Sequence, residues 1–135
     1  MDNEIKNDFV IYRLEKAKET LNTAEKILED IKDYSSANNR AYYAIFYAIR
    51  AVLAMEEKDF KRHKDVIAYF NKNYINTEIF PRKLGRKISQ AQHTREDSDY
   101  DDEFIPTYEK TREQIETAKE LVKLVENYIK DKLKI

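Results

Sequence analysis

Arginine and histidine residues at helical spacing are the first candidates for chemistry in this sequence of 135 residues. Arg86 and His93 lie seven residues apart, which is two turns of an α-helix and places both side chains on one face. An arginine can hold a phosphate while a histidine transfers a proton, as in ribonucleases that use no metal ion. This spacing makes His93 a candidate catalytic residue.

A second candidate group surrounds Arg95, near the middle of a mixed polar segment. Its neighbours Asp99 and Tyr100 could exchange a proton with a substrate, although both are weaker proton carriers at neutral pH than histidine. The candidate catalytic residues are therefore Arg95, Tyr100, Asp99 and His93.

Metal chemistry is not indicated by the sequence. His63 and His93 lie thirty residues apart, and neither an HExxH motif nor a Glu-x-x-His pair occurs. The acidic run from Glu96 to Glu103 alternates like a calcium loop, but it lacks the glycine that such a loop needs. We interpret this run as a solvated acidic loop, and a single glycine in the chain excludes glycine-rich phosphate loops. No cofactor is expected.

Basic residues between Lys58 and Arg95 point to an anionic partner. This segment holds ten basic and three acidic residues, a local charge of +7 in a chain whose net charge is −1. Such a surface binds phosphates if its helices are adjacent; alternatively, these side chains only solvate two short helices.

A second basic and aromatic face runs along one helix, as Arg40, Tyr43, Tyr47 and Arg50. Its residue types stack on bases and hold phosphates, although tyrosines on a central helix also pack in the core. The residues predicted to contact nucleic acid are Arg40, Tyr43, Arg86, Lys87, Lys61 and His63.

The elements that must position these residues are helices throughout, because apolar residues recur every three or four positions. Tyr34–Ser36 is predicted to end the first helix and to supply N-cap hydroxyls for the second. Pro106 is a plausible first residue of the last helix. Helices are predicted at about 4–32, 37–57, 66–74, 82–94 and 106–133.

The predicted fold is therefore all-α, a single domain over residues 1–135 built as an antiparallel bundle of about five helices. Two long outer helices would flank a buried second helix, whose segment 41–49 is apolar or aromatic all round. The absence of cysteine, short apolar stretches and an acidic N-terminus favour a cytoplasmic protein with no membrane contact.

These segments together resemble the HEPN family of small helical-bundle proteins. The strongest match is Asn38–Leu53, which is similar to the family's second helix and follows a first helix of the type Tyr12–Ala17. Phe60–Ile67 resembles the start of the third helix, and Arg95–Asp101 resembles the arginine-bearing segment. The resemblance covers nearly the whole chain and keeps its parts in order.

The resemblance implies a homodimer, often encoded beside a minimal nucleotidyltransferase as a toxin–antitoxin-like pair. Many members are ribonucleases that use an arginine, a spacer of about four to six residues and a histidine. Arg95 matches that arginine, whereas Tyr100 stands where the histidine would be. Either Tyr100, Asp99 or His93 substitutes for it, or the chain binds RNA without cleaving it. Tyr100 would also be the candidate for nucleotide addition by the partner.

Three hypotheses follow from these observations. In the first, the chain is an RNA-binding protein or metal-independent ribonuclease in which Arg95 holds a phosphate. In the second, it is a non-catalytic dimeric module that binds and regulates a minimal nucleotidyltransferase. In the third, it is a dimeric scaffold whose arginines only close ion pairs.

Overall fold

The chain folds into helices only, in the part that the structure describes. A computed structural model describes residues 2–100 and 105–135, with residues 97–100 described by their backbone alone. The elements are α1 (Asn3–Lys26), the π-helical turn η1 (Ile27–Ile31), α2 (Tyr34–Ala54), α3 (His63–Phe70), the π-helical turn η2 (Asn71–Ile75), α4 (Lys83–Tyr100) and α5 (Tyr108–Leu133). The predicted all-α bundle is confirmed.

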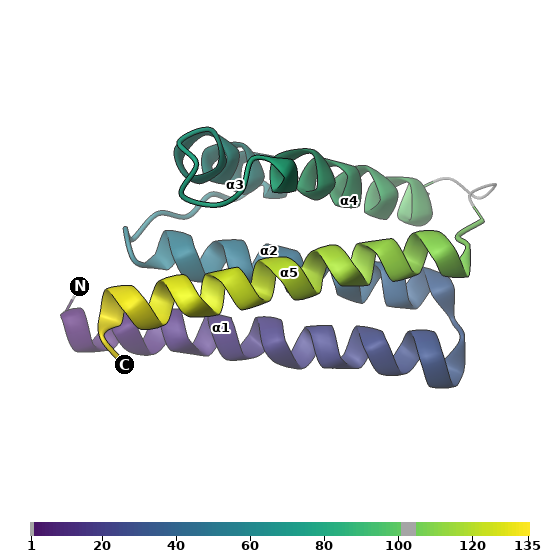
Figure 1. The fold of residues 1–135 in the computed structure, drawn as a ribbon, viewed down its shortest axis with the longest axis horizontal. Coiled ribbons are helices and arrows are strands. Elements are labelled where there is room, and N and C mark those ends of the chain that lie inside the picture. Colours follow the sequence, from purple (N-terminus) through teal and green to yellow (C-terminus); the bar gives the residue numbers. More distant parts are fainter. Residues whose placement is uncertain (1, 101–104) are drawn as a thin grey trace.

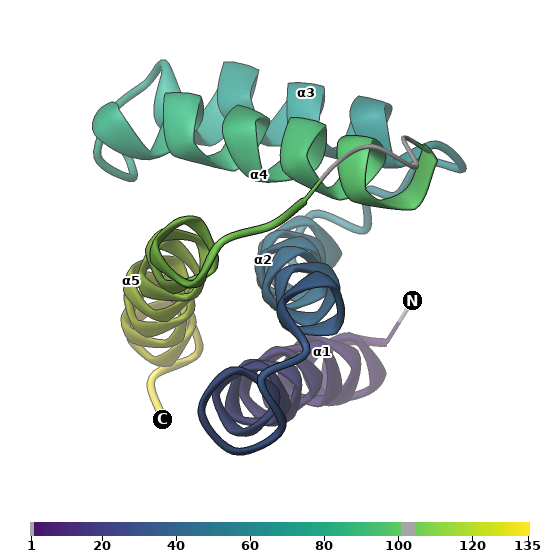
Figure 2. The ribbon, with the colours of Figure 1, turned by 90° about the vertical axis from the view of Figure 1, so that its right-hand side faces the viewer.

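The helices form two layers (Figure 1). The long helices α1, α2 and α5 lie side by side, and α3 and α4 lie together over α2 and α5. Viewed along the long helices, α3 and α4 run across them (Figure 2). This arrangement places α2 at the centre of the fold, where it contacts α1, α3, α4 and α5.

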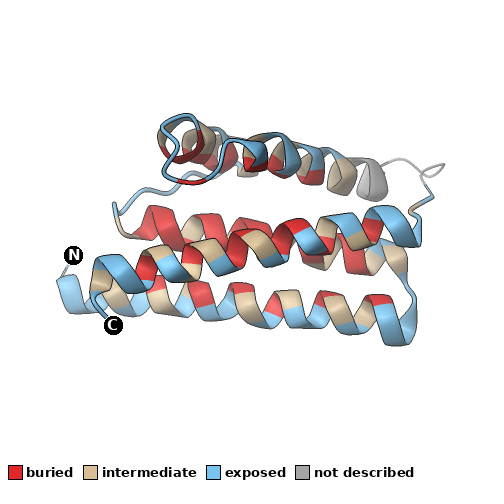
Figure 3. Cartoon of the chain, in the orientation of Figure 1, coloured by how far each residue is buried: buried red, intermediate tan, exposed pale blue. Residues whose placement is uncertain are grey.

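Helix α2 is the most buried element, as its sequence predicts (Figure 3). Its alanines are small enough to let neighbouring helices approach closely, while Ile45 and Ile49 are completely buried between them. Tyr42 is also buried, with 2% of its surface exposed, whereas Tyr43 and Tyr47 are only half-buried. The edge of α2 that the neighbouring helices leave partly uncovered therefore carries the rings of Tyr43 and Tyr47, which pack against the core and remain partly exposed.

The connection between α1 and α2 differs from the prediction. Tyr34–Ser36 forms the first turn of α2 rather than a break, because Asp33 supplies the cap. The Asp33 carboxylate accepts hydrogen bonds from Ser36 N at 3.1 Å and from Ser36 Oγ at 2.6 Å. A carboxylate at the N-cap satisfies the helix donors more strongly than a hydroxyl, so the helix begins before the serines.

The predicted acidic loop is wrong in its first half. Helix α4 continues through Glu96 to Tyr100, because no glycine or proline follows Gly85 before Pro106 and an acidic run alone does not stop a helix. Residues 101–103 of the predicted loop lie outside the described residues. Pro106 precedes α5, whose N-cap is Thr107; the Thr107 hydroxyl accepts a hydrogen bond from Lys110 N at 3.2 Å.

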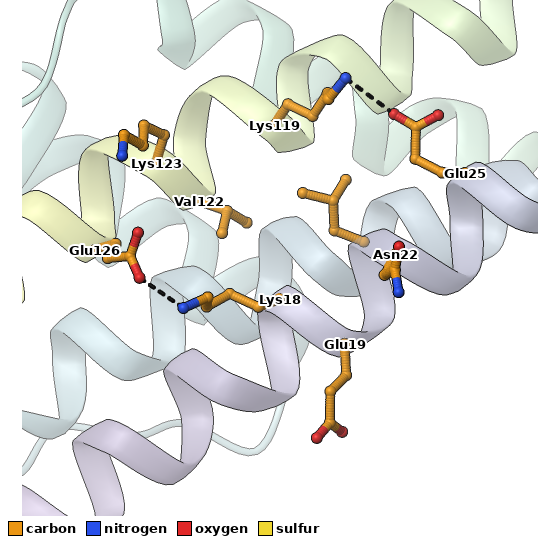
Figure 4. Close-up of a pocket in the computed structure, with 9 residues that line it drawn as sticks. Lys18, Glu19, Asn22, Glu25, Lys119, Val122, Lys123 and Glu126 are labelled. Atoms are coloured by element: carbon orange, nitrogen blue, oxygen red, sulfur yellow. Dashed lines mark hydrogen bonds and ion pairs between the residues drawn. The ribbon is translucent and has the colours of Figure 1, made fainter.

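Ion pairs join α1 to α5 along their exposed edges. Lys18 Nζ lies 2.6 Å from Glu126 Oε2, and Lys119 Nζ lies 3.2 Å from Glu25 Oε1. The two pairs flank a groove of about 710 Å³, whose floor includes Val122 (Figure 4). Glu25 also accepts from Arg112 at 2.8 Å, and this hydrogen bond lowers the pKa of the Glu25 carboxyl. Among the described residues, no helix is both long and apolar enough to span a membrane.

Truncation of a buried isoleucine in α2 should destabilise the protein more than truncation of an exposed isoleucine. We expect Ile49→Ala to lower the free energy of unfolding by about 2–5 kcal/mol, because it leaves a cavity between the layers. Ile31→Ala is the matched control: Ile31 is 68% exposed, and its truncation should change stability by less than about 0.5 kcal/mol. Urea denaturation followed by circular dichroism measures both. Equal losses in the two variants would contradict the central placement of α2.

Candidate functional site

Arg95 points into the bundle rather than into solvent. It lies one turn after Ala91 on the stripe of α4 that buries Leu84, Ile88 and Ala91, so the helix turns its side chain towards α2. Arg95 Nη2 donates a hydrogen bond to Tyr43 Oη at 3.3 Å. Its Cζ lies 5.6 Å from the ring centroid of Tyr42 and 5.7 Å from that of Tyr43. The guanidinium is thus stacked on two tyrosines of α2.

His63 reaches the same two tyrosines from another element. It is the first residue of α3, and its Nδ1 lies 3.1 Å from Tyr42 Oη. Its ring centroid lies 4.0 Å from that of Phe46 and 5.7 Å from that of Tyr43. The imidazole is half-buried, with aromatic rings of α2 around it.

The site therefore brings together two residues that are 32 positions apart in the sequence. The Tyr43 ring centroid lies 5.7 Å both from Arg95 Cζ and from the His63 ring centroid. Burial, followed by the positive charges of Arg95 and Arg50, lowers the pKa of His63 below its ordinary value of 6.5. The site consequently offers one permanent cation beside a neutral imidazole at neutral pH, a combination suited to a phosphate group.

The segment before α3 holds His63 in place through a three-residue ion-pair cluster. Arg50 Nη2 lies 2.7 Å from Asp59 Oδ2, and Arg13 Nη2 lies 3.6 Å from the same oxygen. Burial acts to raise the pKa of Asp59, but the hydrogen bond from Arg50 and neighbouring groups outweigh it and lower that pKa. Arg50, which the sequence offered as a phosphate ligand, therefore ties α2 to this segment.

Of the predicted catalytic partners of Arg95, only His93 has a described side chain, and it does not lie at Arg95. His93 is exposed, and its position two residues before Arg95 corresponds to about 200° around the helix. The side chains of Asp99 and Tyr100 lie outside the described residues. The structure thus separates Arg95 from His93 and brings His63 to it instead.

Three of the predicted nucleic-acid contacts lie at the site: Tyr43 and His63 are part of it, and Arg40 borders it. Arg40 Cζ lies 5.0 Å from the Tyr43 ring centroid, and Arg40 Nη2 donates to Asn39 Oδ1 at 2.8 Å. Tyr47 continues this edge of α2, with Lys16 Nζ at 5.9 Å from its ring centroid. Cations from α1, α2 and α4 therefore lie on the aromatic edge that Tyr43 and Tyr47 form.

The other basic residues lie elsewhere. Lys87 approaches Glu120 of α5 at 3.9 Å, and Lys83 pairs with the same carboxylate at 3.1 Å, which partly neutralises that surface. Arg86 lines a separate small cavity of about 290 Å³ between η2 and α4. Lys61 is exposed, two residues before His63. The predicted basic segment therefore divides over several surfaces.

The described residues contain no group of three histidine or acidic side chains that could hold a metal ion. The pairing of His63 with Arg95 is the feature that sequence reasoning missed. The helical period of α4 places Arg95 on a buried stripe and is visible in the sequence, but the approach of His63 depends on how α3 returns over α2.

His63 should make stability depend on pH in a defined range. Because its pKa is lowered in the folded chain, the unfolded chain binds more protons just below pH 6.5. The contribution of His63 is present above its unfolded pKa and is lost as the pH falls through the folded pKa. Urea unfolding at about pH 7.5 and pH 5.5 should show a smaller loss of stability in His63→Gln than in wild type.

The exposed His93 provides the matched control for this measurement. His93→Gln should keep the wild-type loss of stability between the two pH values. If His63→Gln loses as much stability as wild type between these two pH values, the lowered pKa of His63 would be contradicted.

Comparison with known proteins places the chain in a family. A family model described as HEPN domain matches residues 10–128. A UPF0332 protein of Thermotoga maritima is 28% identical, over 93% of this chain and 95% of its own length. Two proteins of Methanocaldococcus jannaschii, named "Putative toxin MJ0605" and "Putative toxin MJ0142", are each 33% identical. The first match covers 87% of both chains, and the second covers 65% of this chain and 59% of the relative. The chain is therefore a member of the HEPN domain family.

Proposed function

We propose that this chain is a toxin-like HEPN protein that binds RNA at Arg95 and His63 and cleaves it without a metal ion. The observation that carries the proposal is the convergence of Arg95 and His63 on Tyr42 and Tyr43. A phosphodiester carries a negative charge and accepts hydrogen bonds without donating any. An arginine beside a neutral imidazole supplies the matching charge and donors.

Cleavage at this site would proceed by attack of the RNA 2′-hydroxyl on the adjacent phosphorus. The hydroxyl loses its proton to solvent, the bond from phosphorus to the 5′ oxygen breaks, and that oxygen takes a proton from water. The products are a 2′,3′-cyclic phosphate and a 5′-hydroxyl end. Arg95 would stabilise the charge that develops on the phosphorus oxygens, and His63 would hydrogen-bond the same group. Arg40, beside Tyr43, would contact a neighbouring phosphate.

The names of the relatives support a toxin-like role, because two of them are named as toxins. The resemblance to paired HEPN proteins further supports a minimal nucleotidyltransferase as the partner. The alternative is a non-catalytic dimeric module that binds and regulates this partner. Tyr100, in place of the histidine expected after Arg95, favours that alternative.

A homodimer would use the exposed apolar stripe at the start of α1. Ile5, Phe9 and Tyr12 follow one another at helical spacing and are 55%, 46% and 64% exposed. Exposed apolar patches of this kind mark sites of association. Arg13, next to the stripe, stacks on Phe9 at 5.3 Å and also approaches Asp59. The stripe therefore adjoins the segment that positions His63.

Incubation of labelled RNA with the protein in excess EDTA tests the ribonuclease proposal. Wild type should cleave, and Arg95→Ala should lower the rate by about a hundredfold or more, because it removes the charge at the phosphate. Arg82→Ala removes an exposed arginine that directly precedes α4, and it should leave the cleavage rate unchanged. A substrate with 2′-deoxyribose at the cleaved position should stay intact.

The same variants separate the two candidate functions. No cleavage by wild type, with RNA binding that is equal in wild type and Arg95→Ala, would support the non-catalytic alternative. RNA binding that falls in Arg95→Ala, without cleavage by wild type, would contradict the cleavage step and keep Arg95 as an RNA contact.

Light scattering after gel filtration tests the dimer surface. The double variant Phe9→Asp and Tyr12→Asp should shift the protein from dimer to monomer, because it places two charges in an apolar contact. Ile31→Asp, which changes an isoleucine that is 68% exposed at the end of η1, should remain dimeric. A dimer that survives the double variant would exclude this stripe as the interface.

A further inference from the structure

The hydroxyl of Tyr42 is the feature that decides how His63 can act. Tyr42 belongs to the most buried helix, and 2% of its surface is exposed. Among the residues whose side chains the structure describes, its Oη makes one hydrogen bond, to His63 Nδ1 at 3.1 Å. The ring of His63 is held against Phe46 at 4.0 Å, so it cannot turn away without leaving this aromatic contact.

The two directions of this hydrogen bond are not equivalent. If His63 Nδ1 carried the proton and donated it to Tyr42 Oη, the phenol proton would be buried without an acceptor among the described residues. A buried donor without an acceptor loses its hydration and gains nothing in return. If Tyr42 donates to Nδ1, the phenol proton is satisfied and the histidine proton stays on Nε2, the nitrogen that Tyr42 does not contact.

The geometry points to Tyr42 as the residue that fixes His63 as its Nε2–H tautomer, so that His63 serves as a hydrogen-bond donor to a phosphate oxygen and not as a general base. Only the identity of this ligand rests on the proposed function. Tyr42 is a positioning residue, because it acts through His63 and does not itself reach the ligand.

The charged groups around Tyr42 and His63 favour a neutral His63 that donates a hydrogen bond. Among the residues whose side chains are described, the charged groups that act on His63 are Arg95 of α4 and Arg50 of α2, and both disfavour a positive imidazolium. Tyr42 faces Arg95, Tyr43 and Glu96, and its burial raises the pKa of its hydroxyl. Tyr42 therefore keeps its proton and remains able to donate it. Protonation of Nδ1 would remove the acceptor that this proton needs.

The consequence for recognition is that Arg95 and His63 give the described part of the site two kinds of hydrogen-bond donor. Arg95 supplies charged N–H groups, and His63 supplies a neutral Nε2–H. Such a site favours an anion that only accepts hydrogen bonds, which is the chemistry of a phosphodiester.

NMR of protein labelled with ¹⁵N at histidine tests the tautomer without any RNA. In wild type at neutral pH, Nδ1 of His63 should show the shift of an unprotonated nitrogen and Nε2 that of a protonated one. The spectrum of His93→Gln assigns the two histidines. A wild-type spectrum with the proton on Nδ1 would overturn the inference, whether or not any variant folds.

Removal of one hydroxyl provides the matched comparison. In Tyr42→Phe the ring remains but the donor to Nδ1 is lost, so His63 should become a mixture of tautomers. The midpoint of its protonation should rise by about one pH unit. Tyr43→Phe removes a hydroxyl that contacts Arg95 instead and should keep the Nε2–H tautomer of His63. An unchanged tautomer and midpoint in Tyr42→Phe would contradict the role of Tyr42.

RNA binding by two conservative variants of His63 then connects the tautomer to function. His63→Gln keeps an N–H near the Nε2 position and should bind RNA within about threefold of wild type, whereas His63→Asn, which places its amide near Nδ1, should bind about tenfold more weakly. The expected tautomer in a protein that binds no RNA would refute the proposed function alone. RNA binding by a protein whose His63 has the proton on Nδ1 would refute this inference alone.

Discussion

The burial of α2 on nearly all sides is the constraint on which the rest of this molecule depends. A helix of alanines, isoleucines and aromatic residues has no solvated face of its own, so it must be enclosed by α1 and α5 in one layer and by α3 and α4 in the other. Its alanines allow this close enclosure. Where the enclosure is incomplete, the helix presents tyrosines, and the candidate site forms at that edge.

The site forms because other helices pack around α2. Arg95 of α4 and His63 of α3 are both positioned by contacts with residues of α2. Arg95 is an extension of the buried stripe of α4, and it stacks on rings that α2 presents. His63 sits on a ring of the same helix, and Arg50 and Arg13 fix the segment that precedes it through Asp59. Aromatic rings thus serve both as part of the core and as the platform on which Arg95 and Arg40 lie.

Much of the fold follows from the sequence because it depends on periodicity. The apolar stripes define the long helices, and the unbroken apolar run in α2 identifies the central one. The errors concern helix ends, where single hydrogen bonds decide: Asp33 caps α2 ahead of the serines, and α4 runs through Glu96 because no residue there stops it. Only part of the site could be predicted from the sequence. Arg95 lies on a predictable stripe, whereas the approach of His63 is a tertiary contact that no local pattern encodes.

The division of the site between two helices has a consequence for how such proteins change over time. A motif that places arginine and histidine on one helix ties both to a fixed spacing, so an inserted residue between them separates the pair. Here Arg95 and His63 meet through the surface of α2, and the connecting segment that includes Asn76–Glu78 is separated from His63 by α3 and η2 and from Arg95 by most of α4. Insertions in that connection leave the pair intact. A chain that keeps Tyr42, Tyr43 and Phe46 can therefore change the length of this connection without shifting the register of either helix that carries the pair.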